Sequence, residues 1–315
     1  MPLRRDPLPR MAGHLAFMRA PRVVLADLAP GMVAALGVAR DGTGAWAGQT
    51  RFGPTALRET SAYFGSHFSA NMKAAMDIDR RRVLQGGMMT GRLVDLGDLA
   101  VEHLPATQAQ AVIREAVAAV SGRGATALLL GGDLDIVPAA LQGAAAGAPA
   151  ALRAGGVARV QLGGGVVEGE WSAAPGVRFH TATAGCVSDG VGRGAGGDEL
   201  TISWVRQADP VRLRERLQQA LQGWPAFVVL DLSVFAAHWH GMHAAAPLTG
   251  PGLREVRRLM EALGTLSIAG LAITGLDATR CGLSTVKTGQ RLALTAVLDL
   301  LYGLLGPDSG RIDVA

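Results

Sequence analysis

The sequence predicts an α/β fold in which helices cover both faces of a mainly parallel sheet. Along the chain, short apolar runs of strand type alternate with segments whose apolar residues follow helical periodicity. Two of these runs, residues 125–130 and 227–230, are almost entirely apolar, which is typical of strands buried on both faces of a parallel sheet. Because 49% of the residues are apolar, the chain can bury a large core.

The apolar runs give the expected strands. Each is short, rich in Val, Leu, Ile or Ala, and followed by Gly, Pro or Asp residues that favour a turn. The expected strands are residues 23–28, 32–38, 92–96, 125–130, 157–162, 200–205, 227–231 and 268–274.

Two helix starts in the first half of the chain are indicated by their residues. Pro54 suits the first turn of a helix that opens at Phe52 and runs on to residues 63–64. Thr107, with Gln110 three residues later, has the spacing of a capping box, which predicts the start of the next helix.

Three further helices are expected in the second half. Asp209 followed by Pro210 predicts an N-cap and a first turn, and the helix continues to Leu221. Another amphipathic helix ends at Gly264. Residues 288–305 form the last helix, which is apolar on most sides.

Composition limits the classes of function. The formal net charge is only +4 and the Arg residues are scattered, so the concentrated basic surface that nucleic-acid binding needs is not expected. Two cysteines, Cys186 and Cys281, favour a reducing cytoplasm over a disulfide framework. The longest apolar stretch, residues 292–305, contains Asp299 and is shorter than the roughly 20 residues of a membrane span. A soluble, cytoplasmic protein is expected.

The chain is expected to contain one structural domain. Residues 1–20 are predicted to be an N-terminal arm, because they are rich in Pro and Arg and lack a continuous apolar run. From residue 21 to residue 315 we find no internal repeat and no linker that would divide two domains.

The clearest candidate site lies at the end of the strand at residues 227–231. Ligands of open α/β sheets bind outside the carboxyl ends of the strands, where Asp231 is expected. The loop that follows contains His238, His240 and His243. These three imidazoles are interpreted as polar groups near the site, as ligand contacts, or as ligands of one divalent metal ion such as Zn²⁺ or Ni²⁺.

Three further side chains are candidates. Asp133 and Asp135 follow a buried strand, where they either bind a ligand or cap the next helix. His180 follows a short apolar run and is either a strand-end histidine or an acid/base group.

Five motifs, in this order along the chain, resemble those of the ureohydrolase family, which includes arginase, agmatinase and guanidinobutyrase. They are Arg51-Phe-Gly-Pro-Thr-Ala-Leu-Arg-Glu59, Asp95-Leu-Gly-Asp98, Leu130-Gly-Gly-Asp133, the Pro/Gly turn at residues 247–253, and residues 288–296. The resemblance spans residues 23–305. It implies an arginase-like three-layer α/β/α sandwich around a mainly parallel sheet of about eight strands.

The family's activity requires two Mn²⁺ ions that activate a bridging hydroxide, and here the sequence departs from the family. Leu134 stands where the resemblance places a ligand His, and residues 163–167 are Gly-Gly-Gly-Val-Val where it places three ligands. Asp231 is retained, but Ser233 replaces the second carboxylate of that motif, so one of six ligands remains. The substrate-binding Glu corresponds to about Gly275. His180 stands about where the family has a proton-shuttling or substrate-orienting His.

Three functions are compatible with these residues. The leading hypothesis is metal-independent acid/base chemistry on a small amine- or guanidine-derived metabolite, with Asp231, His180 and Ser233 as catalytic residues. The substrate-binding residues would be His238, His240, His243, Asp133 and Asp135. The first alternative is a catalytically inactive pseudoenzyme that acts as the partner or regulatory subunit of an active ureohydrolase. The second is a mononuclear metallohydrolase that uses the His238, His240 and His243 loop.

The expected partners follow from the same hypotheses. No cofactor is expected under the first one, and one divalent metal ion under the last. A small-molecule ligand is expected, but neither nucleic acid nor a membrane. The resemblance implies a homo-oligomer, a trimer or a hexamer, while the pseudoenzyme hypothesis implies a hetero-oligomer with a ureohydrolase paralogue.

Overall fold

An eight-stranded sheet lies at the centre of the fold, and all of its paired strands are parallel. The computed structural model describes residues 15–42, 49–62, 74–77, 82–85, 91–148, 156–163, 182–184, 199–200, 207–235, 251–277, 283–305 and 311–313. The order across the sheet is β4 (Leu93–Asp98), β1 (Val33–Gly37), β5 (Thr126–Leu130), β10 (Ile268–Thr274), β9 (Ala226–Asp231), β6 (Ala158–Leu162), β7 (Ala182–Ala184) and β8 (Glu199–Leu200). Six of these strands have five to seven residues and two are shorter, which confirms the predicted fold class.

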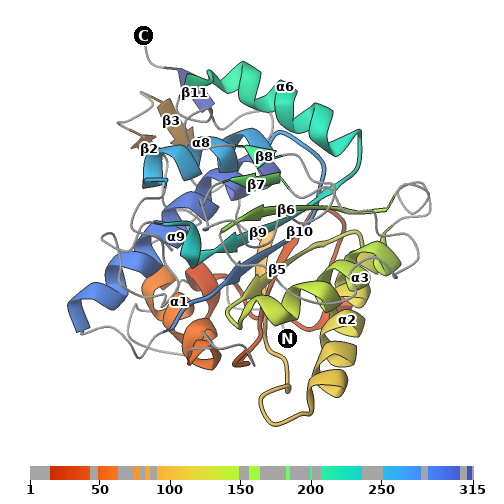
Figure 1. Cartoon of the computed structure of the whole chain (residues 1–315). Coiled ribbons are helices and arrows are strands. Elements are labelled where there is room, and N and C mark those ends of the chain that lie inside the picture. Colours follow the sequence, from red (N-terminus) through yellow and green to blue (C-terminus); the bar gives the residue numbers. More distant parts are fainter. Residues whose placement is uncertain are drawn as a thin grey trace.

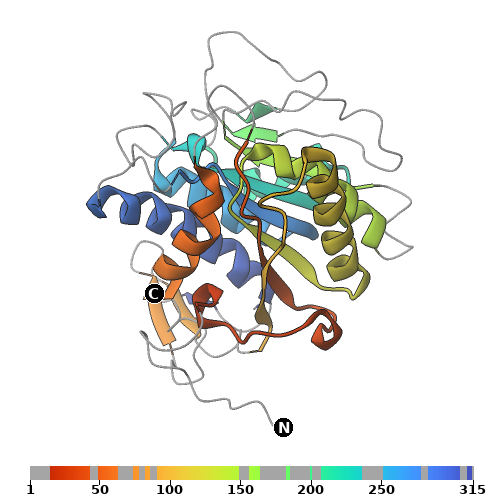
Figure 2. The ribbon, with the colours of Figure 1, turned by 90° about the horizontal axis from the view of Figure 1, so that it is seen from below.

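Helices cover both faces of the sheet, so the fold has three layers (Figure 1 and Figure 2). On one face lie α1 (Gly53–Ser61), α6 (Pro210–Leu221), α8 (Leu253–Leu263) and α9 (Leu283–Leu305). On the other lie α2 (Ala106–Gly122) and α3 (Val137–Gly147). Along β5, Leu128 and Leu130 enter the first core, whereas Ala127 and Leu129 enter the second. This alternation explains why the run is apolar at successive positions.

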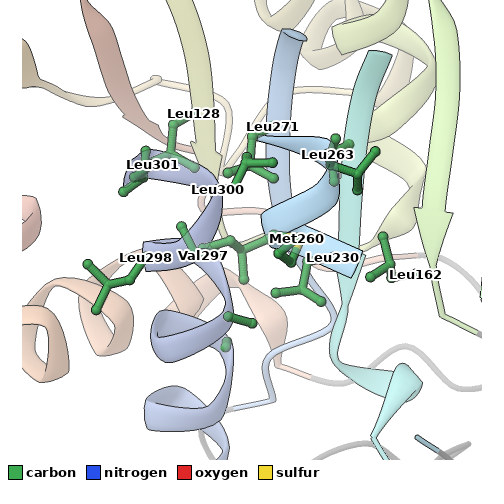
Figure 3. Packing of buried hydrophobic residues seen from close by; sticks show 14 of the residues in the cluster. Leu128, Leu162, Leu230, Met260, Leu263, Leu271, Val297, Leu298, Leu300 and Leu301 are labelled. Atoms are coloured by element: carbon green, nitrogen blue, oxygen red, sulfur yellow. The ribbon is translucent and has the colours of Figure 1, made fainter. Parts of the chain in front are cut away.

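The core on the α8 and α9 side is built mainly from Leu, together with Ala and Val (Figure 3). Strand side chains such as Leu128, Leu230 and Leu271 meet Met260 from α8 and Leu300 from α9 there. The apolar residues of α9 from 293 to 301 are thus largely buried within the chain itself. None of the described helices is long and apolar enough to cross a membrane.

Two predictions about local structure were wrong. Residues 23–28 were expected to form a strand, but Arg22 makes a single parallel bridge to Asp95 and Leu25–Asp27 form the 3₁₀ helix η2. The Asp27 carboxylate accepts a hydrogen bond from the Val24 N–H at 3.3 Å, which favours a turn over an extended segment. Val24 is 65% exposed, whereas Leu28 at the end of the run is buried in the core on the α2 and α3 side.

The second error concerns the start of α2. Thr107 was expected to be its N-cap, but the helix begins at Ala106 and its N-cap is Pro105, without a side-chain capping bond. Thr107 therefore lies inside the first turn. By contrast, Asp209 caps α6 as predicted, because its Oδ1 accepts a hydrogen bond from the Arg212 N–H at 2.9 Å. The last helix begins at Leu283, five residues before the predicted start.

A small antiparallel sheet was not foreseen from the sequence. It joins β11 (Arg311–Asp313), β3 (Arg82–Gln85) and β2 (Ala74–Asp77) in that order. Of the predicted strand at residues 200–205, only the beginning is described, as β8; residues 201–206 lie outside the described part of the chain.

A buried ion pair joins α1 to β4. The Arg58 guanidinium donates to both oxygens of Asp95, from Nε to Oδ2 at 2.8 Å and from Nη2 to Oδ1 at 3.1 Å. Both side chains are buried, and Nη1 of Arg58 also contacts Asp98 Oδ1 at 2.5 Å. Burial by itself favours the neutral carboxyl, but the hydrogen bonds and charge of Arg58 outweigh it and hold the pKa of Asp95 below its ordinary value.

The same carboxylate also holds the N-terminal segment. Asp95 Oδ2 accepts a hydrogen bond from the Phe17 N–H at 2.7 Å, and the Met18 N–H donates to Ser61 Oγ at 2.7 Å. Phe17 and Met18 are fully buried, so the last residues of the predicted arm pack against α1 and the sheet. Residues 1–14 lie outside the described part of the chain.

The close contact between α2 and α3 leads to the first testable prediction. A Cβ added to Gly147 would lie 2.3 Å from the Ala118 carbonyl oxygen of α2. Gly147→Ala should therefore lower the free energy of unfolding by about 1–3 kcal/mol. Gly122→Ala is the matched control, because a Cβ there meets nothing within 4 Å; it should be neutral or stabilising by up to about 1 kcal/mol. Urea denaturation measures the free energy of unfolding of both variants. Equal changes in the two variants would contradict the close packing of Gly147 on α2.

The Arg58–Asp95 pair leads to a second prediction. Arg58→Met leaves a buried carboxylate without its partner and should cost about 3–5 kcal/mol of stability at pH 7. The pKa of Asp95 is lowered in the folded state, so its contribution is present above the unfolded pKa of about 4 and is lost as the pH falls further. The variant should accordingly lose less stability than the wild type does upon acidification. Urea denaturation from pH 7 to pH 3 measures both effects; a loss below about 1 kcal/mol at pH 7 would place this pair among weak surface bridges.

Candidate functional site

The candidate site is the carboxyl edge of the sheet, where the parallel strands end. Asp231 ends β9 and Thr274 ends the neighbouring β10, and the two residues are partners in the strand register. The Thr274 hydroxyl donates to Asp231 Oδ2 at 2.9 Å, and both residues are fully buried. The structure therefore places Asp231 where it was expected and adds Thr274, which orients its carboxylate.

The turn after β5 is fastened to the end of β10. The Gly131 N–H donates to the Ile273 carbonyl at 2.9 Å, and the Gly275 N–H donates to the Gly132 carbonyl at 3.1 Å. Gly131 has a φ of +79°, and a Cβ there would lie 2.3 Å from Cδ of Pro54. Only glycine fits this contact, so the start of α1 packs directly on the turn that carries the aspartates.

Asp133 acts as a capping residue. It is the N-cap of the 3₁₀ helix η5 (Leu134–Ile136), and its Oδ1 accepts a hydrogen bond from the Leu134 N–H at 2.7 Å. Its carboxylate also lies against the loop after β1, since a Cβ added to Gly42 would be 1.8 Å from Asp133 Oδ2. This geometry matches the capping interpretation of Asp133.

Asp135 lies in a different environment, although it is only two residues further on. Its Oδ2 is 3.6 Å from Nε of Arg40, whose Nη1 donates to the Leu104 carbonyl at 3.0 Å. Among the described residues, none donates a hydrogen bond to the buried Oδ1 of Asp135. Burial raises the pKa of Asp135 to about 6, and the negative charges of Asp133 and Asp41 act in the same direction, against Arg40.

A second ion pair completes this part of the edge. Asp41 accepts a hydrogen bond from the Arg51 N–H at 2.9 Å, and its Oδ2 is 3.4 Å from Nη1 of Arg51. The Arg51 guanidinium lies over the ring of Phe52, 5.3 Å from its centroid. The residues before Pro54 are thus tied to the loop after β1. Sequence reasoning did not identify Arg40, Asp41 or Thr274, because no local pattern reveals which loops become neighbours.

Several predicted site residues lie outside the described part of the chain. These are His180, His238, His240 and His243; Ser233 belongs to the 3₁₀ helix η7 (Leu232–Val234), but its side chain is also outside that part. The roles expected of these residues stay predictions.

The described residues do not supply the donor atoms of a two-manganese centre. Leu134 is aliphatic and Gly163, directly after β6, has no side chain, although the resemblance places ligands at both positions. Asp231 is the one retained carboxylate, and it already accepts the Thr274 hydroxyl. Within the described residues, no three His, Cys, Asp or Glu side chains come together as a group that could hold a metal ion.

A family model matches part of the chain. Residues 32–155 match the model of the Arginase family. The match includes β1, α1, β4, α2, β5 and α3. It ends before residues 163–167 and Asp231–Ser233, where the resemblance places five of the six ligand positions. No curated protein matches the sequence.

Solved structures match almost the whole chain. A hypothetical agmatinase from Burkholderia thailandensis has a TM-score of 0.70 at 18% identity, over 94% of this chain and 92% of that one. Formimidoylglutamase from Bacillus subtilis has a TM-score of 0.71 at 16% identity, over 97% and 98% of the two chains. Proclavaminate amidino hydrolase from Streptomyces clavuligerus has a TM-score of 0.69 at 19% identity, over 94% and 99%. At this level of identity the likeness establishes the fold.

The buried bond between Thr274 and Asp231 leads to a third prediction. Thr274→Val keeps the shape of the side chain but leaves Asp231 Oδ2 without this donor, which should cost about 1–3 kcal/mol of stability. Thr274→Ser keeps the hydroxyl and is the control; the loss of one methyl group should cost about 1 kcal/mol or less. Urea denaturation at pH 7 compares the two variants. A valine variant that is as stable as the serine variant would show that the hydroxyl does not stabilise the carboxylate.

Proposed function

We propose that this chain, a member of the ureohydrolase (arginase) family, lacks the binuclear manganese site and performs metal-independent acid/base chemistry on a small amine- or guanidine-derived metabolite. The observation that carries the proposal is the contrast at the carboxyl edge of the sheet. Leu134 and Gly163 provide no metal donors, yet three aspartates persist at or just after the ends of β5 and β9. Fold inheritance does not by itself transfer an activity, so the proposal rests on these side chains.

Charge supports a cationic ligand. The described loops and strand ends at this edge contain the carboxylates of Asp41, Asp133, Asp135 and Asp231, against the guanidinium groups of Arg40 and Arg51. An excess of carboxylates favours a positively charged ligand whose N–H groups can donate charge-assisted hydrogen bonds. Protonated amines and guanidines have both properties.

The roles within the proposed reaction follow from the chemistry of each group. Asp231, oriented by the Thr274 hydroxyl, anchors the substrate cation or accepts a proton. His180 serves as the acid or base, and Ser233 is the third catalytic residue. His238, His240 and His243 bind the substrate and close the site, and Asp133 and Asp135 bind its positive charge.

A second candidate is a pseudoenzyme that acts as the partner or regulatory subunit of an active ureohydrolase. The observation that favours it is that Asp133 is already engaged as a cap and Asp231 by Thr274. The final helix adds no support, because its apolar residues from 293 to 301 are largely buried within this chain. Under this proposal the protein forms a hetero-oligomer with a paralogue; under the first it forms a homo-oligomer, a trimer or a hexamer. Native mass spectrometry of the protein from its own cells separates the two.

The mononuclear metallohydrolase is a third candidate, with His238, His240 and His243 as ligands of one divalent ion. Its motivation is the His-x-His-x-x-His spacing.

The fourth prediction tests these candidates by metal content. Untagged protein, incubated with Mn²⁺, Ni²⁺ or Zn²⁺ and then desalted, should contain well below one ion per chain by inductively coupled plasma mass spectrometry. Methylguanidinium and putrescine should raise the Tm of the metal-free protein, and Asp231→Asn, which keeps the shape but loses the charge, should abolish that rise.

The opposite results are equally informative. About one ion per chain that is lost from the His238, His240 and His243 triple alanine variant would establish the mononuclear site. Two Mn²⁺ per chain with release of urea would refute the proposal. No Tm rise with any amine or guanidine, together with a co-purified paralogue, would favour the regulatory subunit.

A further inference from the structure

The Arg40–Asp135 pair connects two neighbouring loops of the carboxyl edge, the loop after β1 and the turn after β5. We propose that Asp135 is a proton-operated switch, neutral in acid and an incompletely satisfied anion at neutral pH, which makes this edge hold a cationic ligand only when the proton has left. The switch itself rests on the geometry of the described residues. Only the cationic nature of the ligand rests on the proposed function.

The two oxygens of Asp135 are poorly satisfied. Oδ2 lies 3.6 Å from Nε of Arg40, which is longer than a hydrogen bond. The Arg40 guanidinium is held in place by the Leu104 carbonyl, to which its Nη1 donates at 3.0 Å. Oδ1 is buried and receives no hydrogen bond from any described residue. A buried carboxylate in this state is costly when it is ionised.

The charges around Asp135 also disfavour its ionised form. Asp133 belongs to the same turn and Asp41 to the loop after β1, and both are negative; Arg40 is the positive charge beside them. Arg51 pairs with Asp41 rather than with Asp135. From the segment before α2, Glu102 and His103 are largely exposed and lie 3.9 Å from each other. Burial and like charge therefore outweigh Arg40, in keeping with a pKa of about 6 for Asp135.

The sign of the pH effect follows from this shift. The pKa of Asp135 is higher in the folded protein, about 6, than the ordinary value of 3.8. Between these values the folded state binds the proton more tightly than the unfolded state does, so stability falls as the pH rises through this window. Above about pH 6 the cost of the buried charge is fully present, and the positive charge of a cation bound at this edge would offset part of it.

The stability of two variants tests the switch. Asp135→Asn removes the charge and keeps the size of the side chain. Its Tm should exceed that of the wild type by several degrees at pH 7.5, and this difference should shrink as the pH falls through 6 towards 4. Asp209→Asn is the control, because Asn is as good an N-cap as Asp at this exposed position; its difference from the wild type should not change across this range.

The opposite sign would overturn the switch. If Asp135→Asn were less stable than the wild type at pH 7.5, Asp135 would be an ordinary stabilising partner of Arg40. Titration of the wild-type Asp135 carboxyl carbon by ¹³C NMR decides the matter even if the variant does not fold. A midpoint near pH 6 supports the switch, and a midpoint near pH 4 refutes it.

Ligand binding separates this inference from the proposed function. Methylguanidinium, added at pH 5 and at pH 7.5, should raise the Tm of the wild type at least threefold more at the higher pH, and this difference should disappear in Asp135→Asn. A Tm rise that is equal at both pH values would refute the switch and leave the proposed function intact. If the NMR midpoint lies near pH 6 but neither methylguanidinium nor putrescine changes the Tm, the proposed ligand class is wrong. The proposed coupling of the Asp135 proton to ligand binding is then wrong as well.

Discussion

The buried ion pair between Arg58 and Asp95 is the constraint on which the rest of the structure depends. It fixes the first helix, α1, against the edge strand β4, and the same carboxylate accepts the Phe17 N–H of the N-terminal segment. Through α1 the pair also positions the carboxyl edge, because Pro54 at the start of that helix packs on Gly131. A guanidinium and a carboxylate that satisfy each other with two hydrogen bonds can be buried where either alone could not.

Residues that pack helices and strands together are constrained by the space available, whereas residues at a reactive site are constrained by their chemistry. Gly131 and Gly147 sit where an added Cβ would approach a neighbouring atom within 2.3 Å, so the packing tolerates no larger residue there. Leu134 stands where the resemblance places a ligand His, and its aliphatic side chain is buried in the core on the α2 and α3 side. A chain can therefore keep the arginase fold while the residues at the family's metal-ligand positions differ, and the family match over residues 32–155 includes both of these glycines.

Asp231 and Asp135 both lie at the carboxyl edge, but the surroundings of their carboxylates differ. Asp231 is fully buried, but the Thr274 hydroxyl donates to its carboxylate at 2.9 Å. Asp135 is less buried, yet one of its oxygens has no donor among the described residues and its nearest cation is already engaged by the Leu104 carbonyl. The two carboxylates therefore differ in hydrogen bonding, and burial, with no donor at Oδ1 among the described residues, raises the pKa of Asp135 to about 6.

The sequence by itself determined the elements whose cause is local. Continuous apolar runs located the central strands, and Pro54 and Asp209 located two helix starts, because strand burial and capping act over a few residues. The sequence also placed Asp231 at a strand end. The run at residues 23–28 failed because Val24 is exposed and the Asp27 carboxylate favours a turn, and the Thr107 cap failed because the helix already begins after Pro105. Only the tertiary structure decided the strand order, and with it the pairs Arg58–Asp95, Thr274–Asp231 and Arg40–Asp135. These partners lie 37, 43 and 95 positions apart, and sequence patterns that span one turn or one strand contain no information about such distances.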